Sequence, residues 1–211
     1  DDFGNDTWLD DSWQYTGNTG VWGQISIDPE LNMAYLPVEC PTGDYYGGHR
    51  IGDNLFANSL VAIDLDTGER VWHFQVSHHD VWDWDLPAAP ILADITVDGR
   101  EIKAVAVPTK QAWIFVFDRE TGEPVWPIEE RPVEGSEVPG EVLAATQPFP
   151  TKPPAIDRQG IGIDDLIDFT PELRAAAEQI ANRYVLGPIY TPPTLADPNG
   201  TLGTLILPAA T

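Results

Sequence analysis

Cysteine occurs only once in this sequence, as Cys40, so no disulfide can form within the chain and cysteine usage leaves the redox compartment open. Basic residues are also scarce: 11 Lys and Arg stand against 34 Asp and Glu, and the formal net charge is −23. Such a charge repels nucleic-acid phosphates and anionic membrane surfaces, so we expect no nucleic-acid partner. No apolar run approaches the ~18 residues that span a bilayer, and no basic-then-apolar signal segment opens the chain. We expect a mature exported protein or an internal fragment.

The abundant residues describe a folded chain. Hydrophobic residues make up 42% of the 211 positions and include eight tryptophans, which argues against disorder. Twenty prolines and eighteen glycines predict many turns and little helix. We therefore expect an all-β fold with a sizeable core, either as one domain or as a piece of a larger one.

An internal repeat is the central feature of the sequence. Residues 61–72, VAIDLDTGERVW, recur as residues 115–126, FVFDRETGEPVW, at an offset of 54 residues. Each copy predicts a strand, a tight Asp-x-x-Thr-Gly turn and a second strand that opens on tryptophan. Further strands are expected at 89–97 and 101–108. Roughly four short antiparallel strands per repeat are typical of a β-propeller blade.

Two later segments depart from the repeat. Seven prolines fall within residues 127–160, which predicts an extended excursion across the surface. A short helix is expected at about 171–184, because Thr170 can cap it and apolar residues follow at helical spacing. This helix is amphipathic, so we expect it to pack against the rest of the protein. Residues 201–207 are expected to form a closing strand.

A pair of carboxylates follows the strand predicted at 70–76. If the extended conformation continues, Asp83 and Asp85 share one face, and the neighbouring Trp82 and Trp84 share the other. Two carboxylates a few ångströms apart repel by roughly 4 kcal/mol at an effective dielectric of about 20, so one holds a proton or a cation lies between them. The pair predicts a metal site or a general base. The structural alternative is a strand end whose acids face water and whose tryptophans fill the core.

The preceding His78, His79 and Asp80 allow another interpretation, an iron or zinc site. Adjacent histidines on a strand point to opposite faces and do not easily share one ion. We therefore expect these histidines to make structural hydrogen bonds, and we expect the same of His49 and Arg50.

Several motifs occur together: the repeated Asp-x-x-Thr-Gly-x-x-x-Trp, HHDVWDWD at 78–85, LPAAP at 86–90 and TQPF at 146–149. This combination resembles the quinoprotein dehydrogenases that use pyrroloquinoline quinone (PQQ), and it is most similar to the membrane-bound glucose dehydrogenase type. WD-repeat proteins fit less well, because their repeat is about 40–45 residues. The resemblance implies an eight-bladed β-propeller with the quinone on its axis, of which residues 1–211 would supply roughly three blades.

The resemblance also implies catalytic roles. Asp83 matches the family's base, which would take the hydroxyl proton of the substrate while hydride passes to the quinone and a divalent ion polarises its carbonyl. Asp85 matches a further metal ligand of lanthanide-using members, but glucose-type members carry an acid there too, so Asp85 does not choose the metal. Lys110 matches the cation that touches the quinone and would stabilise developing negative charge. Calcium or magnesium, held by Asp83 and Asp85, is expected ahead of a lanthanide.

Two more residues would contact the quinone or the metal. Trp22, in a Trp-Gly segment before an Asp-Pro-Glu turn, matches the tryptophan that forms the floor under the quinone, where a flat indole suits a flat ring system. The alternative is a core tryptophan. Thr42 matches a threonine near the cofactor and metal. It is a better candidate than Cys40, because a thiol is a poor ligand for a hard ion.

The resemblance therefore implies PQQ-dependent oxidation of a sugar or alcohol hydroxyl to a carbonyl or lactone. Electrons would pass to a membrane quinone or a cytochrome, in or facing the periplasm. Two alternatives remain: a non-catalytic propeller that serves as an interaction scaffold, and an inactive fragment with exposed strand edges. A scaffold has no need of Asp83 and Lys110, so their joint presence favours the enzyme.

Overall fold

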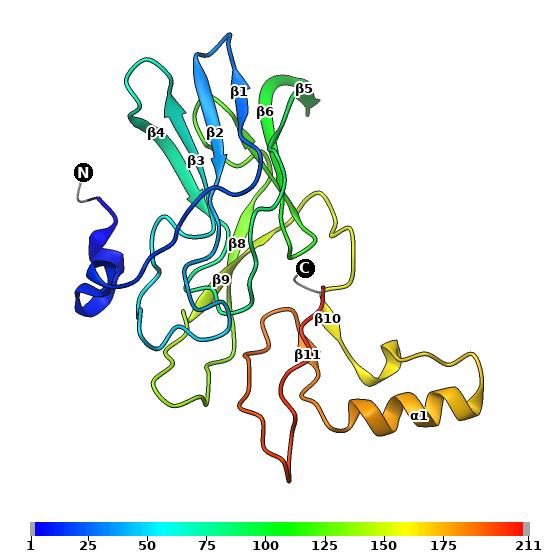
Figure 1. The fold of residues 1–211 in the computed structure, drawn as a ribbon. Coiled ribbons are helices and arrows are strands. Elements are labelled where there is room, and N and C mark those ends of the chain that lie inside the picture. Colours follow the sequence, from blue (N-terminus) through cyan, green and yellow to red (C-terminus); the bar gives the residue numbers. More distant parts are fainter. Residues whose placement is uncertain (1–2, 209–211) are drawn as a thin grey trace.

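The computed structural model describes residues 3–208, which form two antiparallel sheets followed by a long excursion and a short helix (Figure 1). The strands of the first sheet pair in sequence order: β1 (Ser26–Asp28), β2 (Met33–Pro37), β3 (Ser59–Asp64) and β4 (Arg70–Gln75). The second sheet is built in the same way: β5 (Ile91–Val97), β6 (Arg100–Pro108) and β7 (Ile114–Asp118). The prediction of a mostly β chain is confirmed.

The two copies of the repeat differ at the fourth strand. In the first copy Arg70 begins β4, which pairs with β3. The equivalent residue of the second copy is Pro124, and only an isolated bridge to Phe117 forms there. Proline has no N–H to donate to a ladder, so the pairing at this position is weaker than that of Arg70 in β4. The expectation of four strands is therefore wrong for the second copy, which has three.

Both copies make the same turn. The carboxylate of Asp64 accepts hydrogen bonds from the N–H groups two and three residues further on, and that of Asp118 does the same. The glycine four residues after each aspartate has a positive φ, +72° at Gly68 and +78° at Gly122. Glycine adopts this conformation without steric cost. The spacing Asp-x-x-Thr-Gly thus specifies the turn by local interactions alone.

Gly122→Ala is expected to destabilise the chain more than Gly68→Ala. Nothing lies within 4 Å of a Cβ added at Gly68, whereas a Cβ at Gly122 would lie 2.7 Å from Cδ2 of Trp72. Alanine at positive φ costs about 1–2 kcal/mol at either position, and overpacking against the indole adds about 1–3 kcal/mol at Gly122. Urea unfolding of the two variants measures this difference, and equal losses would show that Trp72 moves aside freely.

A backbone carbonyl joins the two sheets. The carbonyl oxygen of Arg119, directly after β7, accepts hydrogen bonds from the Tyr35 hydroxyl at 2.9 Å and from Nε1 of Trp72 at 3.1 Å. The Arg119 guanidinium donates to the carboxylate of Asp28 at 2.6 Å. Tyr35, Trp72 and Asp28 all belong to the first sheet, so these bonds fix the second sheet against it. A single buried cluster of large side chains draws on both sheets.

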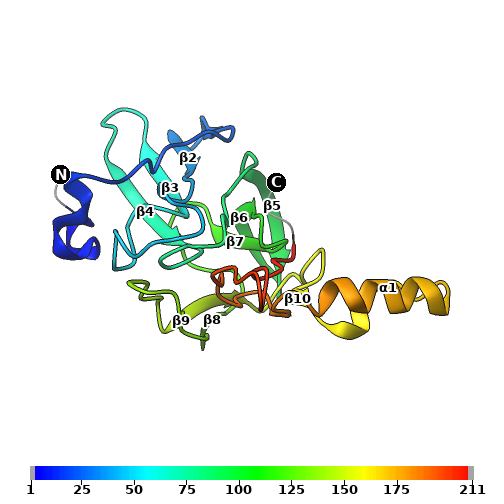
Figure 2. The same ribbon diagram turned by 60° about the horizontal axis from the view of Figure 1, so that its bottom comes forward.

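Residues 127–160 are not the simple extended excursion that their prolines predicted. Within them, β8 (Ile128–Pro132) and β9 (Thr146–Pro150) pair antiparallel (Figure 2). A two-stranded ribbon leaves many N–H groups unpaired, so prolines can occupy positions that face outward. The loop between β8 and β9 reaches back to the first half of the chain, where the Tyr46 hydroxyl donates to the Pro139 carbonyl at 3.2 Å.

The helix α1 (Pro171–Ala181) begins as predicted and ends three residues before the predicted residue 184. Thr170 caps it, since its Oγ1 accepts the N–H of Leu173 at 3.2 Å. The expectation that α1 packs against the rest of the protein is wrong for this chain, because Leu173 and Ile180 are 45% and 62% exposed. Both views show α1 projecting away from the two sheets (Figures 1 and 2).

The remaining elements are short. They are β10 (Gly160–Ile161), β11 (Gly187–Pro188) and three 3-10 turns at Asn5–Thr7, Leu9–Gln14 and Ile163–Asp165. The closing strand expected at 201–207 does not form. Thr204 makes an isolated parallel bridge to Val185, and the neighbouring residues do not extend this pairing into a ladder. Within residues 3–208, no helix combines the length and the apolar character needed to cross a membrane.

Candidate active site

The segment that carries the two carboxylates is not extended, contrary to the expectation from sequence. Asp83 has φ +61°, in the left-handed region, which breaks the strand alternation. Trp82 and Trp84 are nevertheless fully buried, as predicted for the aromatic face. The carboxylates of Asp83 and Asp85 both turn toward one cation, so the predicted pairing holds although the predicted conformation does not.

Lys110 lies between the two carboxylates. Its Nζ is 2.8 Å from Oδ1 of Asp83 and 2.9 Å from Oδ2 of Asp85. Its backbone N–H also donates to the carbonyl of Asp85 at 3.0 Å, which fixes the loop after β6 against this segment. In this structure the ammonium group therefore supplies the cation that two close carboxylates require.

The surroundings move the pKa values of the two carboxyls in opposite directions. Burial and the neighbouring charge of Asp85 raise the pKa of Asp83, although Lys110 opposes them. Burial alone would raise the pKa of Asp85 as well, but hydrogen bonds from the Cys40 N–H and from Lys110 lower it. Paired titratable groups whose pKa values are separated in this way are typical of acid–base sites. Asp83 is the group with the higher affinity for a proton.

Trp22 lies beside this ion pair with an exposed indole. Its Nε1 donates to Oδ2 of Asp85 at 3.3 Å, and Nζ of Lys110 is 5.7 Å from the centroid of its rings. The side chain is 54% exposed, so the alternative of a core tryptophan is wrong. Gly23 allows this placement, because a Cβ there would lie 3.1 Å from the carbonyl of Leu86.

Cys40 contacts the carboxylate pair, whereas Thr42 is held elsewhere. The N–H of Cys40 donates to Oδ1 of Asp85 at 2.7 Å, and its Sγ is 3.7 Å from Oδ1 of Asp83. Burial and the nearby carboxylates raise the pKa of the thiol, which keeps it protonated. The carbonyl of Thr42 accepts a hydrogen bond from Nε of Arg50, and its side chain is exposed. A metal contact for Thr42 stays a prediction.

The residues present fit a hard cation and a flat anionic ring system. One ligand atom from each of Cys40, Asp83 and Asp85 lies within 4.8 Å of the others. Carboxylate oxygens are suitable ligands for Ca²⁺ and Mg²⁺, while a protonated thiol is a weak ligand for these ions. The exposed indole of Trp22 and the ammonium of Lys110 offer stacking and positive charge on one side of this group.

The two histidines separate, as predicted for neighbours in sequence. His78 is half-buried, and its Nδ1 lies 2.8 Å from Oε1 of the buried Gln75. His79 is buried, with Nδ1 2.8 Å from the carbonyl of Gly52 and Nε2 2.6 Å from Oε1 of Glu141. Sequence reasoning missed Glu141, since it lies 62 residues from His79 and no local pattern connects them. The structural role expected of these histidines is confirmed.

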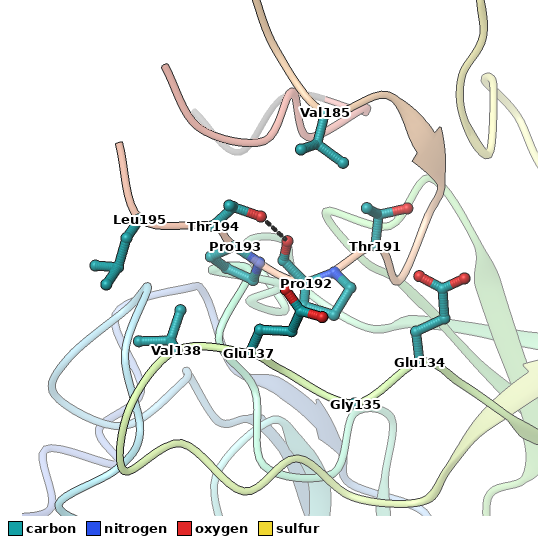
Figure 3. A pocket seen from close by; sticks show the side chains of 10 residues that line it. All are labelled: Glu134, Gly135, Glu137, Val138, Val185, Thr191, Pro192, Pro193, Thr194 and Leu195. Atoms are coloured by element: carbon teal, nitrogen blue, oxygen red, sulfur yellow. Dashed lines mark hydrogen bonds between the residues drawn. The ribbon is translucent and has the colours of Figure 1, made fainter. Parts of the chain in front are cut away.

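A hollow lies between the β8–β9 loop and residues 191–195 (Figure 3). Glu134 and Glu137 contribute carboxylates to it, opposite prolines 192 and 193. It has a link to the carboxylate segment, because Nε1 of Trp82 donates to the carbonyl of Thr191 at 2.8 Å. None of the predicted site residues lines it, so we place the candidate site at the carboxylate pair.

Comparison with known proteins gives a family match over almost the whole chain. The family described as "PQQ: Glucose/ethanol/alcohol dehydrogenase, beta-propeller domain" matches residues 2–211. The quinoprotein glucose dehydrogenase of Escherichia coli (strain K12) is 40% identical over 141 residues, which cover 66% of this chain and 18% of that protein.

Solved structures of two dehydrogenases are also similar to this chain. The quinohemoprotein alcohol dehydrogenase from Comamonas testosteroni is similar with a TM-score of 0.56 and 27% identity, over 70% of this chain and 22% of that one. A europium-containing methanol dehydrogenase has a TM-score of 0.53 and 29% identity, over 68% of this chain and 24% of that one. The chain therefore spans less than a quarter of the length of these relatives.

Proposed function

Because this chain belongs to the PQQ-dependent glucose, ethanol and alcohol dehydrogenase family, within its β-propeller domain, we propose that its protein oxidises a sugar or alcohol hydroxyl to a carbonyl or lactone. One observation carries this proposal: Nζ of Lys110 joins Asp83 and Asp85 at 2.8 and 2.9 Å beside an exposed indole. A propeller that served only as a scaffold would gain little from burying a lysine and two carboxylates together, because desolvation of the charges opposes their attraction.

In this proposal Asp83 is the general base. Its carboxylate would accept the proton of the substrate hydroxyl, and its raised pKa makes it a stronger base than an ordinary aspartate. Lys110 would hold positive charge next to the accepting group, where a preformed ammonium stabilises developing negative charge. PQQ, when bound, would supply the electrophilic carbonyl carbon that receives the hydride.

Trp22, Lys110 and Thr42 would bind the cofactor. The Trp22 indole would form a flat floor, and the orientation of that floor is set by the Nε1 hydrogen bond to Asp85. Thr42 is proposed from family resemblance alone. Its loop is held close to the carboxylates, because the adjacent Cys40 segment donates to Asp85.

Asp83, Asp85 and Thr42 would hold the metal. We propose calcium or magnesium, because two carboxylates supply the hard oxygen ligands that these ions require. A lanthanide is the second candidate, and Asp85 matches the residue that would support it. We propose further that electrons leave to a membrane quinone or a cytochrome, and that the protein works in or facing the periplasm.

The experiment uses the full-length protein that carries this chain. Titration with PQQ and Ca²⁺ should quench tryptophan fluorescence, since Trp22 would stack on the cofactor. The loaded protein should then reduce an artificial dye in the presence of glucose or ethanol, and protein without PQQ serves as the control. Parallel titrations with Mg²⁺ and La³⁺ compare the metals. If the protein shows neither fluorescence quenching nor substrate oxidation with any of the three cations, the proposal fails and a non-catalytic scaffold role is favoured.

A further inference from the structure

We propose that Asp80 is a positioning residue that holds Asp83 in its left-handed conformation through a hydrogen bond to the backbone of Trp84. This inference rests on the proposed role of Asp83 as the base. The Asp80 side chain points toward the backbone: its Oδ2 accepts the N–H of Trp84 at 3.0 Å, and its Oδ1 accepts the Ser77 hydroxyl at 3.2 Å. Asp80 is 1% exposed, so water offers little competition for these bonds.

Asp83 lies inside the turn that this hydrogen bond closes. A non-glycine residue at φ +61° stores on the order of 1–3 kcal/mol of strain and keeps that conformation only where its surroundings hold it. The bond from Trp84 to Asp80 fixes the peptide unit that follows Asp83 and so the direction in which its side chain leaves the backbone. Without it, Asp83 is free to relax toward an extended φ, which moves its carboxylate away from Lys110.

A second contact fixes Asp80 to the loop after β2. The fully buried guanidinium of Arg50 donates from Nη2 to the carbonyl of Asp80 at 2.6 Å and to the carbonyl of Gly43 at 2.9 Å. Its Nη1 donates to Oδ1 of Asn54 at 2.8 Å. A planar guanidinium with several bonds leaves little freedom to the segments that it joins. Asp80 therefore holds Asp83 at a set position relative to this loop.

Asp80→Ala in the full-length protein should lower kcat by about 30- to 100-fold, because a displacement of about 1 Å at a reacting group costs about 100-fold. PQQ affinity, measured by tryptophan fluorescence, should stay within about threefold, since a group acting on the chemical step changes kcat more than binding. Asp80→Asn should recover kcat to within about fivefold, because its amide oxygen accepts the same N–H. Burial raises the pKa of Asp80 to about 7, so a neutral side chain is compatible with this position.

Asp118→Ala is the matched control. It removes the same kind of carboxylate-to-backbone hydrogen bonds, from the exposed turn of the second repeat. It should reduce stability by about 1 kcal/mol and leave kcat unchanged. A loss of kcat in this control equal to that in Asp80→Ala would indicate general destabilisation and would overturn the proposal.

Two readouts separate this proposal from the assignment of the base. Hydrogen exchange of the Trp84 amide should speed up by at least about 100-fold in Asp80→Ala and stay slow in Asp80→Asn, whatever the role of Asp83. In an Asp83→Asn background, Asp80→Ala should lower kcat no further, because both substitutions then act through one group.

Several outcomes would overturn the proposal. They are a wild-type kcat in Asp80→Ala, a further loss of equal size in the Asp83→Asn background, or an unchanged exchange rate of the Trp84 amide. If Asp80→Ala does not fold, Asp80→Ser replaces it. Its shorter hydroxyl holds the Trp84 N–H less well, so kcat should fall by about tenfold. A kcat of Asp80→Ser within twofold of wild type would also overturn the proposal.

Discussion

Asp83→Asn in the full-length protein is expected to reduce kcat for dye-linked oxidation by about 10²- to 10⁴-fold, which is the contribution typical of a general base. An asparagine can keep a hydrogen bond to Lys110 at this position, but it cannot accept a proton. Binding of PQQ should persist, because Trp22 and Lys110 are unchanged. Stopped-flow dye reduction measures the first effect and quenching of tryptophan fluorescence the second.

Asp94→Asn is the control for this substitution. Asp94 is also a carboxylate paired to a cation, with its Oδ1 2.9 Å from Nη1 of Arg119, but it lies at the exposed edge of the second sheet. Its loss should leave kcat unchanged, since exposed ion pairs contribute about 0–1 kcal/mol to stability. A kcat within twofold of wild type in Asp83→Asn would remove Asp83 from the role of base.

Glu141→Ala is expected to lower the free energy of unfolding by about 1–3 kcal/mol, because it leaves buried polar groups of His79 and Gly47 without their hydrogen-bond partner. The carbonyl of Gly52 can only accept, so Nδ1 of His79 carries a proton. Oε1 of Glu141 lies 2.6 Å from Nε2 of His79, and its Oε2 accepts the N–H of Gly47 at 2.5 Å. The pair is buried, since the side chains of His79 and Glu141 are 1% and 3% exposed.

Glu137→Ala serves as the control, because Glu137 belongs to the same loop and is exposed. Its loss should change the free energy of unfolding by less than about 0.5 kcal/mol. Urea unfolding at neutral pH measures both variants. Equal stability of Glu141→Ala and wild type would show that this buried pair contributes nothing to the folded state.

The same pair predicts how stability changes with pH. Burial would raise the pKa of Glu141, but its hydrogen bonds to His79 and to the Gly47 N–H lower it below its ordinary value of 4.5. A folded pKa below the unfolded one gives a stabilisation that is complete above the unfolded pKa and is lost as pH falls through the folded pKa. Stability should therefore decrease as pH falls below 4.5, and this decrease should be smaller in Glu141→Ala. A decrease of equal size in both proteins would contradict the assignment.

The features that could be predicted from sequence are those with a local or periodic cause. The turns at Asp64 and Asp118 follow from their own side chains, and the strands before them are short continuous apolar runs. The family resemblance assigned Lys110 to the quinone and Asp83 and Asp85 to the base and the metal, but it did not predict the ion pairs that join Lys110 to both carboxylates. The left-handed conformation of Asp83 could not be predicted from sequence, since it depends on the buried Asp80 and on contacts made through the main chain.

The errors have physical causes of the same kind. Pro124 removes one backbone donor where the first copy begins β4, although both copies share the Asp-x-x-Thr-Gly-Glu turn. The apolar residues of α1 predicted packing, but α1 projects away from the two large sheets (Figures 1 and 2), and Ile180 remains 62% exposed. Glu141 is buried although it belongs to a proline-rich loop, and the composition of that loop predicted that it lies on the surface. Pro124 could have been recognised in the sequence, whereas the contact of Glu141 is with His79, 62 residues away.

The Arg119 carbonyl bears on how such a protein can be divided and recombined. Tyr35 and Trp72 of the first sheet both donate hydrogen bonds to this one main-chain carbonyl of the second sheet. No substitution at position 119 can remove that acceptor, because it belongs to the backbone. A chimera that exchanged one 54-residue repeat alone would bury two donors without a partner unless the incoming repeat supplied a carbonyl at the same place. Exchange of a single repeat therefore requires that the incoming backbone keep the path that follows its third strand, whatever side chain it carries there.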